Sequence, residues 1–292
     1  MKQRSPWRQF WTEFRQSKVA LAALAAVLLI ALLAMLAPLI TPQNPYDLAS
    51  LVLADARRPP GYVNSQGFVY WLGSDGQGRD LLSAIIHGLR ISIEIGLLAG
   101  AIAFAVGVTM GASAAFLGGR IEAILMRIID LQLSFPAILL ALMISAVLGK
   151  GMPQMVAALA AAQYAYFART AHGAASVERG KDYVEAALST PLPAARVIFR
   201  HILPNSLPPL LVVATVQVAN AIALEATLSF LGLGLPPTEP SLGLLIANGF
   251  EYLLSGRYWI SIFPGVALIV LIVAINLVGD QVRDQLNPWL KR

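Results

Sequence analysis

Long apolar stretches alternate with shorter polar segments along almost the whole chain. Six of these apolar stretches approach or exceed the roughly 20 residues that a helix needs to cross a bilayer. The pattern therefore predicts an all-α integral membrane protein with six transmembrane helices, the third of them kinked by Pro136. The predicted spans are residues 19–40, 91–117, 128–148, 154–175, 206–231 and 259–279.

The basic residues indicate on which side of the membrane each polar segment lies. Six crossings place both termini on one side. With the termini inside, fifteen of the 21 Lys and Arg residues lie on the inner side and six on the outer side. Cytoplasmic segments of membrane proteins carry an excess of Lys and Arg. We therefore expect both termini in the cytoplasm, together with the polar loop at residues 176–205.

This orientation divides the chain into five regions. Residues 41–82, between the first two spans, are rich in Pro and Gly and are expected to have little regular structure. The regions are a cytoplasmic amphipathic N-terminal segment (1–18), the first transmembrane helix (19–40), an outer loop (41–90), a core of five helices that contains the polar loop (91–279), and a cytoplasmic tail (280–292).

Two short helices joined by a corner are predicted within the polar loop. Asp182 is expected to cap the first helix, with Glu185 three residues later in the position of a capping-box acid. Thr190 is expected to cap the second helix, with Pro191 at its first helical position. Pro204 is expected to end that helix, because proline has no backbone N–H to donate.

The second of these helices is predicted to be amphipathic. Apolar residues recur on one face at helical spacing, and basic residues lie on another. Such a helix either lies on lipid headgroups or docks onto another protein, and the spacing alone favours neither. The apolar face consists of Ala195, Ile198, Phe199 and Ile202, and the basic residues are Arg196 and Arg200.

The same loop resembles the EAA loop of bacterial ABC importer permeases. The resemblance rests on Glu185, Ala186 and Ala187, followed by a corner and then by His201-Ile202-Leu203-Pro204. In that family the loop is the coupling helix, which seats in a cleft of the cytoplasmic ATPase. Pro191 stands where the family pattern usually has Gly at the corner.

Three further stretches resemble one branch of these permeases, the dipeptide/oligopeptide/nickel branch, and specifically the second of its two membrane subunits. Asn287 and Leu242 depart from the family pattern, which has Asp and Trp there. The resemblance covers essentially the whole chain and implies the type I ABC importer permease fold. The stretches are LGSDGQGRD at 72–80, LSFLGLGLPP at 228–237 and NLVGD at 276–280 followed by Arg283-Asp284 and Pro288.

The composition offers no catalytic or metal-binding constellation. The chain is 57% hydrophobic, has no cysteine and carries only 13% charged residues, against about 25% in soluble domains. His87, His172 and His201 lie in different segments without metal-ligand spacing. We therefore expect no catalytic, cofactor-binding or metal-binding residues, and any ATP and Mg²⁺ to be bound by partner ATPase subunits.

A few polar residues lie inside the predicted spans. Charge in hydrocarbon is unfavourable, so these groups should face protein or a watery path. Glu94 and Asp130 lie near span ends and are expected to be interfacial. Glu225 lies deeper and is expected to line the path or to join helices, or else to pair with a neighbouring subunit. Asn220 and Asn276 are candidates for the same interior or for helix–helix hydrogen bonds.

Four glycines in the second span form two GxxxG pairs, Gly96 with Gly100 and Gly107 with Gly111. Glycines four residues apart share a helix face and let a second helix approach closely. Glycine is also generally common in membrane helices. The presence of two pairs favours close packing.

The resemblance implies a permease subunit of an ATP-driven, binding-protein-dependent importer in the bacterial inner membrane, most simply of di- or oligopeptides. It implies four kinds of partner: a homologous permease that forms the other half of the path, two ABC ATPases, an extracytoplasmic binding protein and the bilayer. Nucleic acid is not expected despite the net charge of +5. The alternatives are an ABC importer of nickel or glutathione and, from another class, a proton-coupled secondary transporter with Glu225 as the proton site. A membrane enzyme is disfavoured by the missing catalytic set.

Overall fold

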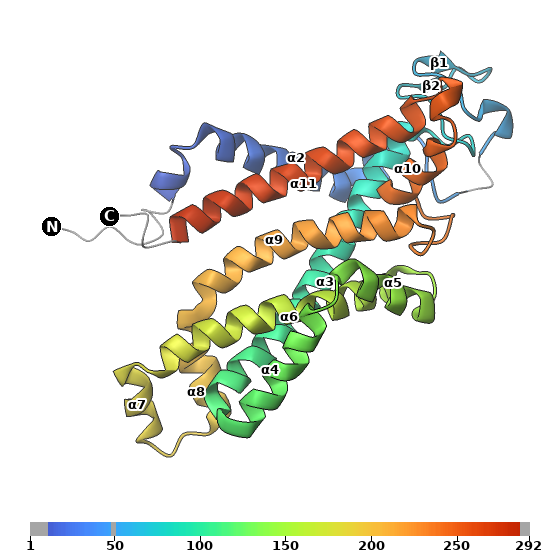
Figure 1. Ribbon diagram of the computed structural model, residues 1–292. Helices are drawn as coiled ribbons and strands as arrows, with labels where there is room; N and C mark the ends of the chain where they lie inside the picture. The colour runs from blue at the N-terminus through green and yellow to red at the C-terminus, as the bar shows by residue number, and fades with distance from the viewer. Residues whose placement is uncertain (1–10, 48–50, 287–292) are drawn as a thin grey trace.

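The computed structural model describes residues 11–47 and 51–286, and almost every described element is a helix (Figure 1). Most of the predicted N-terminal segment and the end of the predicted tail, including Asn287 and Pro288, lie outside the described residues. The main helices are α2 (Lys18–Ile40), α3 (Leu81–Leu117), α4 (Gly119–Leu133), α5 (Ala137–Leu148), α6 (Met152–Arg179), α7 (Asp182–Leu188), α8 (Ala194–Val197), α9 (Leu203–Phe230), α10 (Leu242–Phe250) and α11 (Trp259–Leu286).

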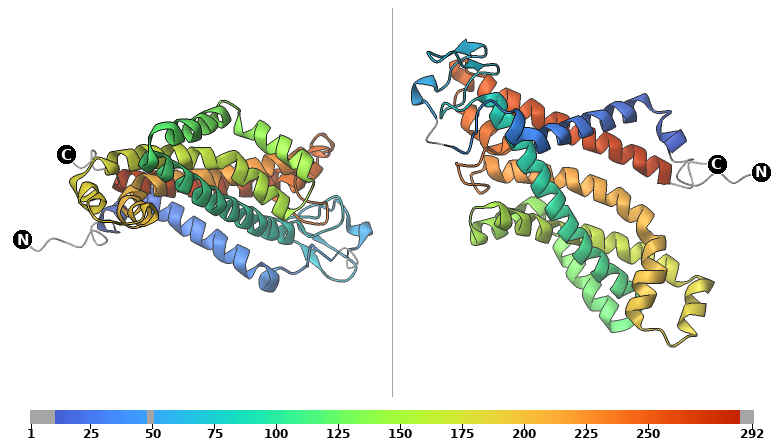
Figure 2. Two further views of the ribbon diagram at one scale, coloured as in Figure 1. Left: turned by 90° about the horizontal axis from the view of Figure 1, so that it is seen from below. Right: turned by 180° about the vertical axis from the view of Figure 1, so that it is seen from behind.

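The long helices run between two ends of the molecule. One end, at the upper right of Figure 1, holds α10 and the hairpin β1 (Tyr62–Val63) and β2 (Val69–Tyr70); the opposite end holds α7 and α8. Helix α2 packs along α11, as Figure 2 also shows. Helix α6 packs against α3 over most of its length and also against α9. Helix α3 contributes buried residues to every hydrophobic cluster of the described residues, so the core of the molecule lies along α3.

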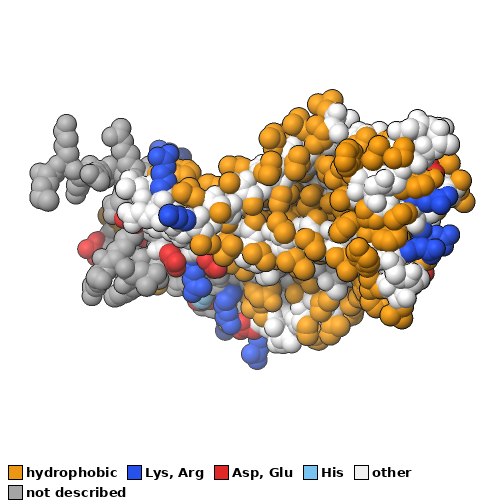
Figure 3. Space-filling view, turned by 90° about the horizontal axis from the view of Figure 1, so that it is seen from above, with side chains coloured by type: hydrophobic (Ala, Val, Ile, Leu, Met, Phe, Trp, Pro, Cys, Tyr) orange, Lys and Arg blue, Asp and Glu red, His pale blue; other side chains and the backbone are white. Residues whose placement is uncertain are grey.

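Hydropathy supports a multi-pass membrane protein. Four described helices are long and apolar enough to cross a bilayer, and five are if the bent pair α4–α5 counts as one. Apolar side chains cover the middle of the surface in Figure 3, whereas Lys and Arg gather at its two ends. Helix α6, with 28 residues, is long enough but fails the same test of composition. Its position between α3 and α9 shields polar side chains that lipid would not accept. The predicted count of six spans is thus not fully confirmed.

Two helices extend beyond the predicted membrane spans. The second long helix begins at Leu81, where Asp80 caps it by accepting a hydrogen bond from the Ser83 N–H at 2.8 Å. The last ten residues of the expected outer loop, 81–90, are therefore helical. Helix α4 begins at Gly119, before the predicted third span, and the chain then bends by 90° into α5, with Pro136 directly preceding α5.

The segment before α3 forms a compact cap, defined here as residues 53–80. The hairpin pairs Tyr62 with Tyr70. Buried Asp55 accepts hydrogen bonds from Asn64 Nδ2 at 3.0 Å and from the Tyr70 hydroxyl at 3.2 Å. Trp259 Nε1 donates to the Ser74 carbonyl at 3.4 Å, which ties the cap to the start of α11. The expected loop with little regular structure is therefore ordered by its own buried polar core.

Candidate functional site

Helix α7 opens the polar loop, and its capping differs from the prediction. The N-cap residue is Lys181, and it makes no side-chain capping hydrogen bond. Asp182 is the first helical residue, so the expected capping box with Glu185 does not form. Both carboxylates lie in the first turn of the helix, where the partial positive charge of the helix N-terminus favours them.

The corner after α7 is also built differently from the prediction. The Thr190 hydroxyl donates to the Ala187 carbonyl at 2.7 Å, so Thr190 closes α7 instead of capping the next helix. The next helix begins at Ala194 with Pro193 as its N-cap residue. Pro191 lies in the exposed corner and not at a first helical position.

Pro204 does not end the second helix of the loop. A π-helical turn, η3 (Ile198–Ile202), joins α8 directly to α9, and the Leu203 N–H donates to the Ile198 carbonyl. Pro204 has no backbone N–H, and the π-helical turn before it lets the neighbouring backbone groups form hydrogen bonds in a different register. The result is an uninterrupted helical path from Ala194 to Phe230, which connects the loop to a membrane helix without a linker.

The loop has one buried face and one exposed face. The buried face packs on α3 and α6, through Val184, Val197, Ile198 and Ile202 against Ala112, Ala115 and Ala175. Phe199, predicted on the apolar face, is 48% exposed. His201 is half-buried. Ala187 is buried. The other predicted coupling residues are exposed, namely Asp182, Glu185, Ala186, Pro191, Arg196, Arg200 and Pro204.

Glu225 lies at the contact between two helices. Its side chain is fully buried, and it accepts hydrogen bonds from the Ser92 hydroxyl of α3 at 2.9 Å and from the Ser229 hydroxyl at 2.8 Å. Asn220 is exposed and donates to Gln217 Oε1 at 3.1 Å, and Asn276 is half-buried. The geometry of Glu225 favours the helix-joining alternative within this chain.

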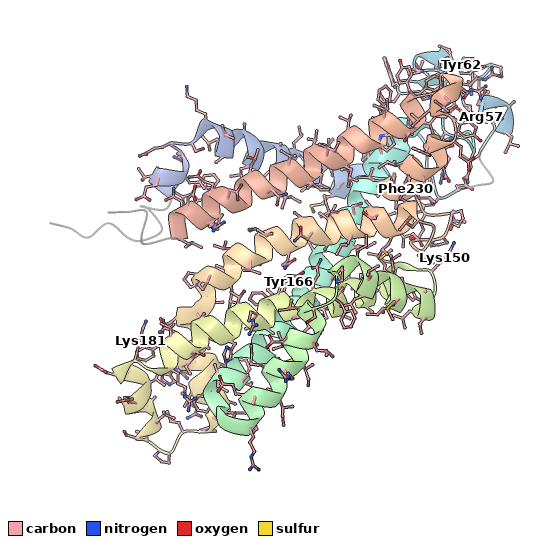
Figure 4. All side chains as sticks on the ribbon, viewed as in Figure 1. Arg57, Tyr62, Lys150, Tyr166, Lys181 and Phe230 are labelled. Atoms are coloured by element: carbon pink, nitrogen blue, oxygen red, sulfur yellow. The ribbon has the colours of Figure 1, made fainter. Side chains whose placement is uncertain are left out.

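A groove of about 1010 Å³ opens along α6, α9 and α11 towards the polar-loop end. Tyr166 faces the space between α6 and α9 in Figure 4. Arg169, beside it, forms an ion pair with Asp130 at 2.6 Å. Glu225, Asn220 and Asn276 do not line this groove. Its lining residues are Leu133, Tyr166, Arg169, Thr170, Asn205, Pro208, Pro209, Val212, Val213, Val216, Gln217, Arg283 and Leu286.

Sequence reasoning missed this groove, and only part of it left a signal. Tyr166, Thr170 and Gln217 are polar residues inside predicted spans and could have been singled out as candidates for a polar lining. The apolar wall of Val212 and Val216 carries no such signal, because valine is equally suited to a surface that faces lipid.

The two glycine pairs of α3 contact different helices. A Cβ added at Gly96 would lie 2.7 Å from Ile222 Cγ1, and one at Gly100 would lie 3.2 Å from Val218 Cγ2, both on α9. At Gly107 and Gly111 an added Cβ would collide with the backbone of α6. These four positions therefore hold α3 close to its two main neighbours.

Within residues 11–47 and 51–286, no group of three or more His, Cys, Asp or Glu side chains is placed to hold a metal ion. His172 instead pairs with Glu122 of α4 at 2.6 Å, and His87 Nε2 lies 3.2 Å from the Thr41 hydroxyl. These histidines thus connect neighbouring segments.

Comparison with known families identifies two matching regions. Residues 107–292 match the model of the binding-protein-dependent transport system inner membrane component. Residues 5–60 match the N-terminal TM domain of oligopeptide transport permease C.

Individual proteins that are similar to this chain also belong to transport systems. A putative peptide transport system permease protein of Brucella suis is 43% identical over 225 residues, which are 77% of this chain and 75% of that protein. The di/tripeptide transport system permease protein DppC of Pseudomonas aeruginosa is 37% identical over 98% of this chain and 93% of its own length. An inward-facing structure of the MetNI methionine ABC transporter is similar with a TM-score of 0.58 at 18% identity, covering 71% of this chain and 98% of the matched chain. The expected importer-permease fold is thereby confirmed.

Proposed function

Because the chain belongs to the family of binding-protein-dependent transport system inner membrane components, we propose that it is the permease subunit of an ATP-driven importer of short peptides. Relatives that align over nearly the whole chain are named as di/tripeptide and dipeptide permeases, which supports the substrate class. In this proposal a homologous permease pairs with the chain, two ABC ATPases bind ATP and Mg²⁺, and an extracytoplasmic binding protein delivers the peptide. Both termini and the polar loop face the cytoplasm.

The proposed coupling role of the polar loop is supported mainly by one observation. Its second helix continues without a break into α9, from Ala194 to Phe230. Its buried face rests on α3 and α6, while Glu185 and Arg200 on the other face are exposed. A push from an ATPase on the exposed face would therefore move α9 directly, whereas a flexible linker would absorb it.

The groove along α6 and α9 supports the role as one half of a path. It is open on one side and so needs a second surface to enclose a substrate. A homologous permease would provide that surface. The mixture of Gln217, Tyr166 and apolar residues suits a peptide, which has both polar main-chain groups and side chains of varied polarity.

The proposed function is tested by reconstituting the chain with its cognate subunits in proteoliposomes. Labelled dipeptide uptake is then measured with ATP present, with ATP removed, and with the proton gradient collapsed by a protonophore. We expect uptake to require ATP and the binding protein and to survive the protonophore. Uptake that persists without ATP and stops with the protonophore would contradict the proposal. Competition by glutathione or Ni²⁺ but not by peptides would contradict the substrate class.

A second test addresses the stiffness of the loop. Two glycines inserted between Pro191 and Leu192 add flexible backbone to the exposed corner without removing a side chain. We expect ATP hydrolysis to continue and peptide uptake to fall to near background. The matched control is the same insertion after Gly149, in the turn between α5 and α6, which should leave uptake unchanged. Full uptake with the corner insertion would show that the loop does not transmit the motion.

A further inference from the structure

A cluster of polar side chains joins three helical elements at the base of the polar loop. The Tyr183 hydroxyl of α7 donates to Glu178 Oε2 of α6 at 2.6 Å. The same hydroxyl accepts a hydrogen bond from Asn205 Nδ2 of α9 at 3.0 Å. Lys181 Nζ lies 2.6 Å from the other oxygen of Glu178, and Asn205 Nδ2 also donates to the His201 carbonyl at 3.0 Å. One oxygen atom of Tyr183 therefore connects α6 to α9 through α7.

Helix α7 needs such an anchor because it is short. It has seven residues, of which only Val184 and Ala187 are buried. Isolated helices shorter than about 12 residues are marginal in water. Two small buried side chains supply little apolar area, so polar contacts at its start contribute much of what fixes its position.

Charge strengthens these contacts at neutral pH. Burial alone would raise the pKa of Glu178, but the hydrogen bonds from Lys181 and Tyr183 and the charge of Lys181 together outweigh it and lower the pKa. Glu178 is therefore ionised at neutral pH and accepts both hydrogen bonds as a carboxylate. Hydrogen bonds to an ionised acceptor are shorter and roughly twice as strong as neutral ones.

We propose that the Tyr183 hydroxyl is a positioning group for coupling, which locks α7 to the last turn of α6 and the first turn of α9 so that both helices move with the loop. This inference rests on the proposed function of the loop in coupling to an ATPase. Tyr183 touches neither the nucleotide nor the peptide in this proposal and acts through the two helices.

The test replaces Tyr183 by Phe in the full transporter reconstituted in proteoliposomes, which removes one oxygen atom and retains the ring. The readout is the number of peptides taken up per ATP hydrolysed, together with the thermal unfolding midpoint. We expect this ratio to fall by about tenfold, as the loss of one hydrogen bond to a charged group implies, while ATP hydrolysis continues and the midpoint changes little. The control is Tyr258→Phe, an exposed tyrosine at the cap end, which should leave the ratio unchanged.

A second variant, Asn205→Ala, removes the hydrogen bond that α9 donates to the Tyr183 hydroxyl. We expect the same loss of coupling, and the double variant should be no worse than Tyr183→Phe alone, because both changes break one chain of contacts. An unchanged ratio in both variants would overturn the inference. A proportional fall in uptake and ATP hydrolysis with a lowered midpoint would also overturn it, because that pattern indicates a merely structural role. Failure of the unmodified transporter to use ATP would instead refute the proposed function.

Discussion

The two ends of the molecule are both made from polar segments of about thirty residues, yet they use charge in opposite ways. In the cap, the carboxylates of Asp55 and Asp75 and the guanidinium of Arg79 are all buried. In the polar loop, Asp182 and Glu185 are exposed. Removing the partner of a buried charge is strongly destabilising, so such a pair stabilises one arrangement of the segment. An exposed charge contributes little to stability but is free to meet a partner.

The centre of the cap is the turn that carries Asp75. Its carboxylate accepts backbone hydrogen bonds from Gln77 at 2.8 Å and Arg79 at 2.9 Å, and it pairs with Arg79 Nε at 2.7 Å. Arg79 is fully buried. In the polar loop the buried carboxylate of Glu178 pairs with Lys181, which is half-exposed, and the rest of the loop packs on α3 and α6 through apolar side chains. The comparison predicts that equal substitutions at the two ends will have unequal effects on stability.

The largest difference is expected between Asp75→Ala and Asp182→Ala. Asp75→Ala leaves the buried guanidinium of Arg79 without its counter-charge, which costs roughly 3–5 kcal/mol. Asp182→Ala removes an exposed acid from the first turn of α7, which costs less than about 1 kcal/mol. Thermal or denaturant unfolding of the purified chain in detergent measures both. Equal losses would show that the cap is not held by its buried pair.

A smaller effect is expected from Tyr70→Phe in the cap. The lost hydrogen bond to the Asp55 carboxylate, at 3.2 Å, is worth about 1.5–3 kcal/mol. Burial and the nearby charge of Asp55 raise the pKa of Tyr70 from 10.0 to about 12. Above pH 10 the unfolded chain therefore releases a proton that the folded chain retains, and the native protein loses stability as the pH rises towards 12.

The Tyr70→Phe variant has no phenol proton to release at this position. The gap in unfolding midpoint between the native chain and the variant should therefore narrow between pH 10.0 and about 12, the ordinary and raised pKa values of this phenol. Tyr258→Phe, an exposed tyrosine at the same end, is the control and should show no change in the gap. A gap that is constant across this range would mean that burial and the charge of Asp55 do not raise the pKa of the Tyr70 phenol.

The same comparison explains how far the sequence could predict the structure. Helix α2 was predicted to within one residue, at 19–40 against Lys18–Ile40, because a helix that mostly faces lipid is apolar all round. The first ten residues of α3 were left outside the predicted span because His87 and Arg90 interrupt the apolar run, although His87 is buried against protein. The cap was missed because Asp55, Asn64 and Tyr70 meet through the fold and leave no local periodicity.

The candidate site was predicted in part, for a similar reason. The position of the polar loop follows from a run of charged residues between apolar ones, and it was found. Its internal detail was not, because Pro204 acts as a helix breaker only when the preceding turn is α-helical, and here that turn is a π-helix. The groove of Val212 and Gln217 depends on which face of α9 meets α6 and α11, which hydropathy alone does not determine.

The smallest effect on stability is expected from Glu185→Ala in the polar loop. Its side chain is exposed, and substitutions at such positions usually change stability by less than about 0.5 kcal/mol. Under the proposed function the same change removes a charge from the surface that meets the ATPase, so uptake per ATP should fall although the chain unfolds at the same temperature. Glu251→Ala at the cap end removes an equally exposed acid and should leave both quantities unchanged. A lowered unfolding midpoint with unchanged uptake per ATP would contradict the comparison. Glu185 would then stabilise the chain itself, as the buried charges of the cap do, and would not contact a partner.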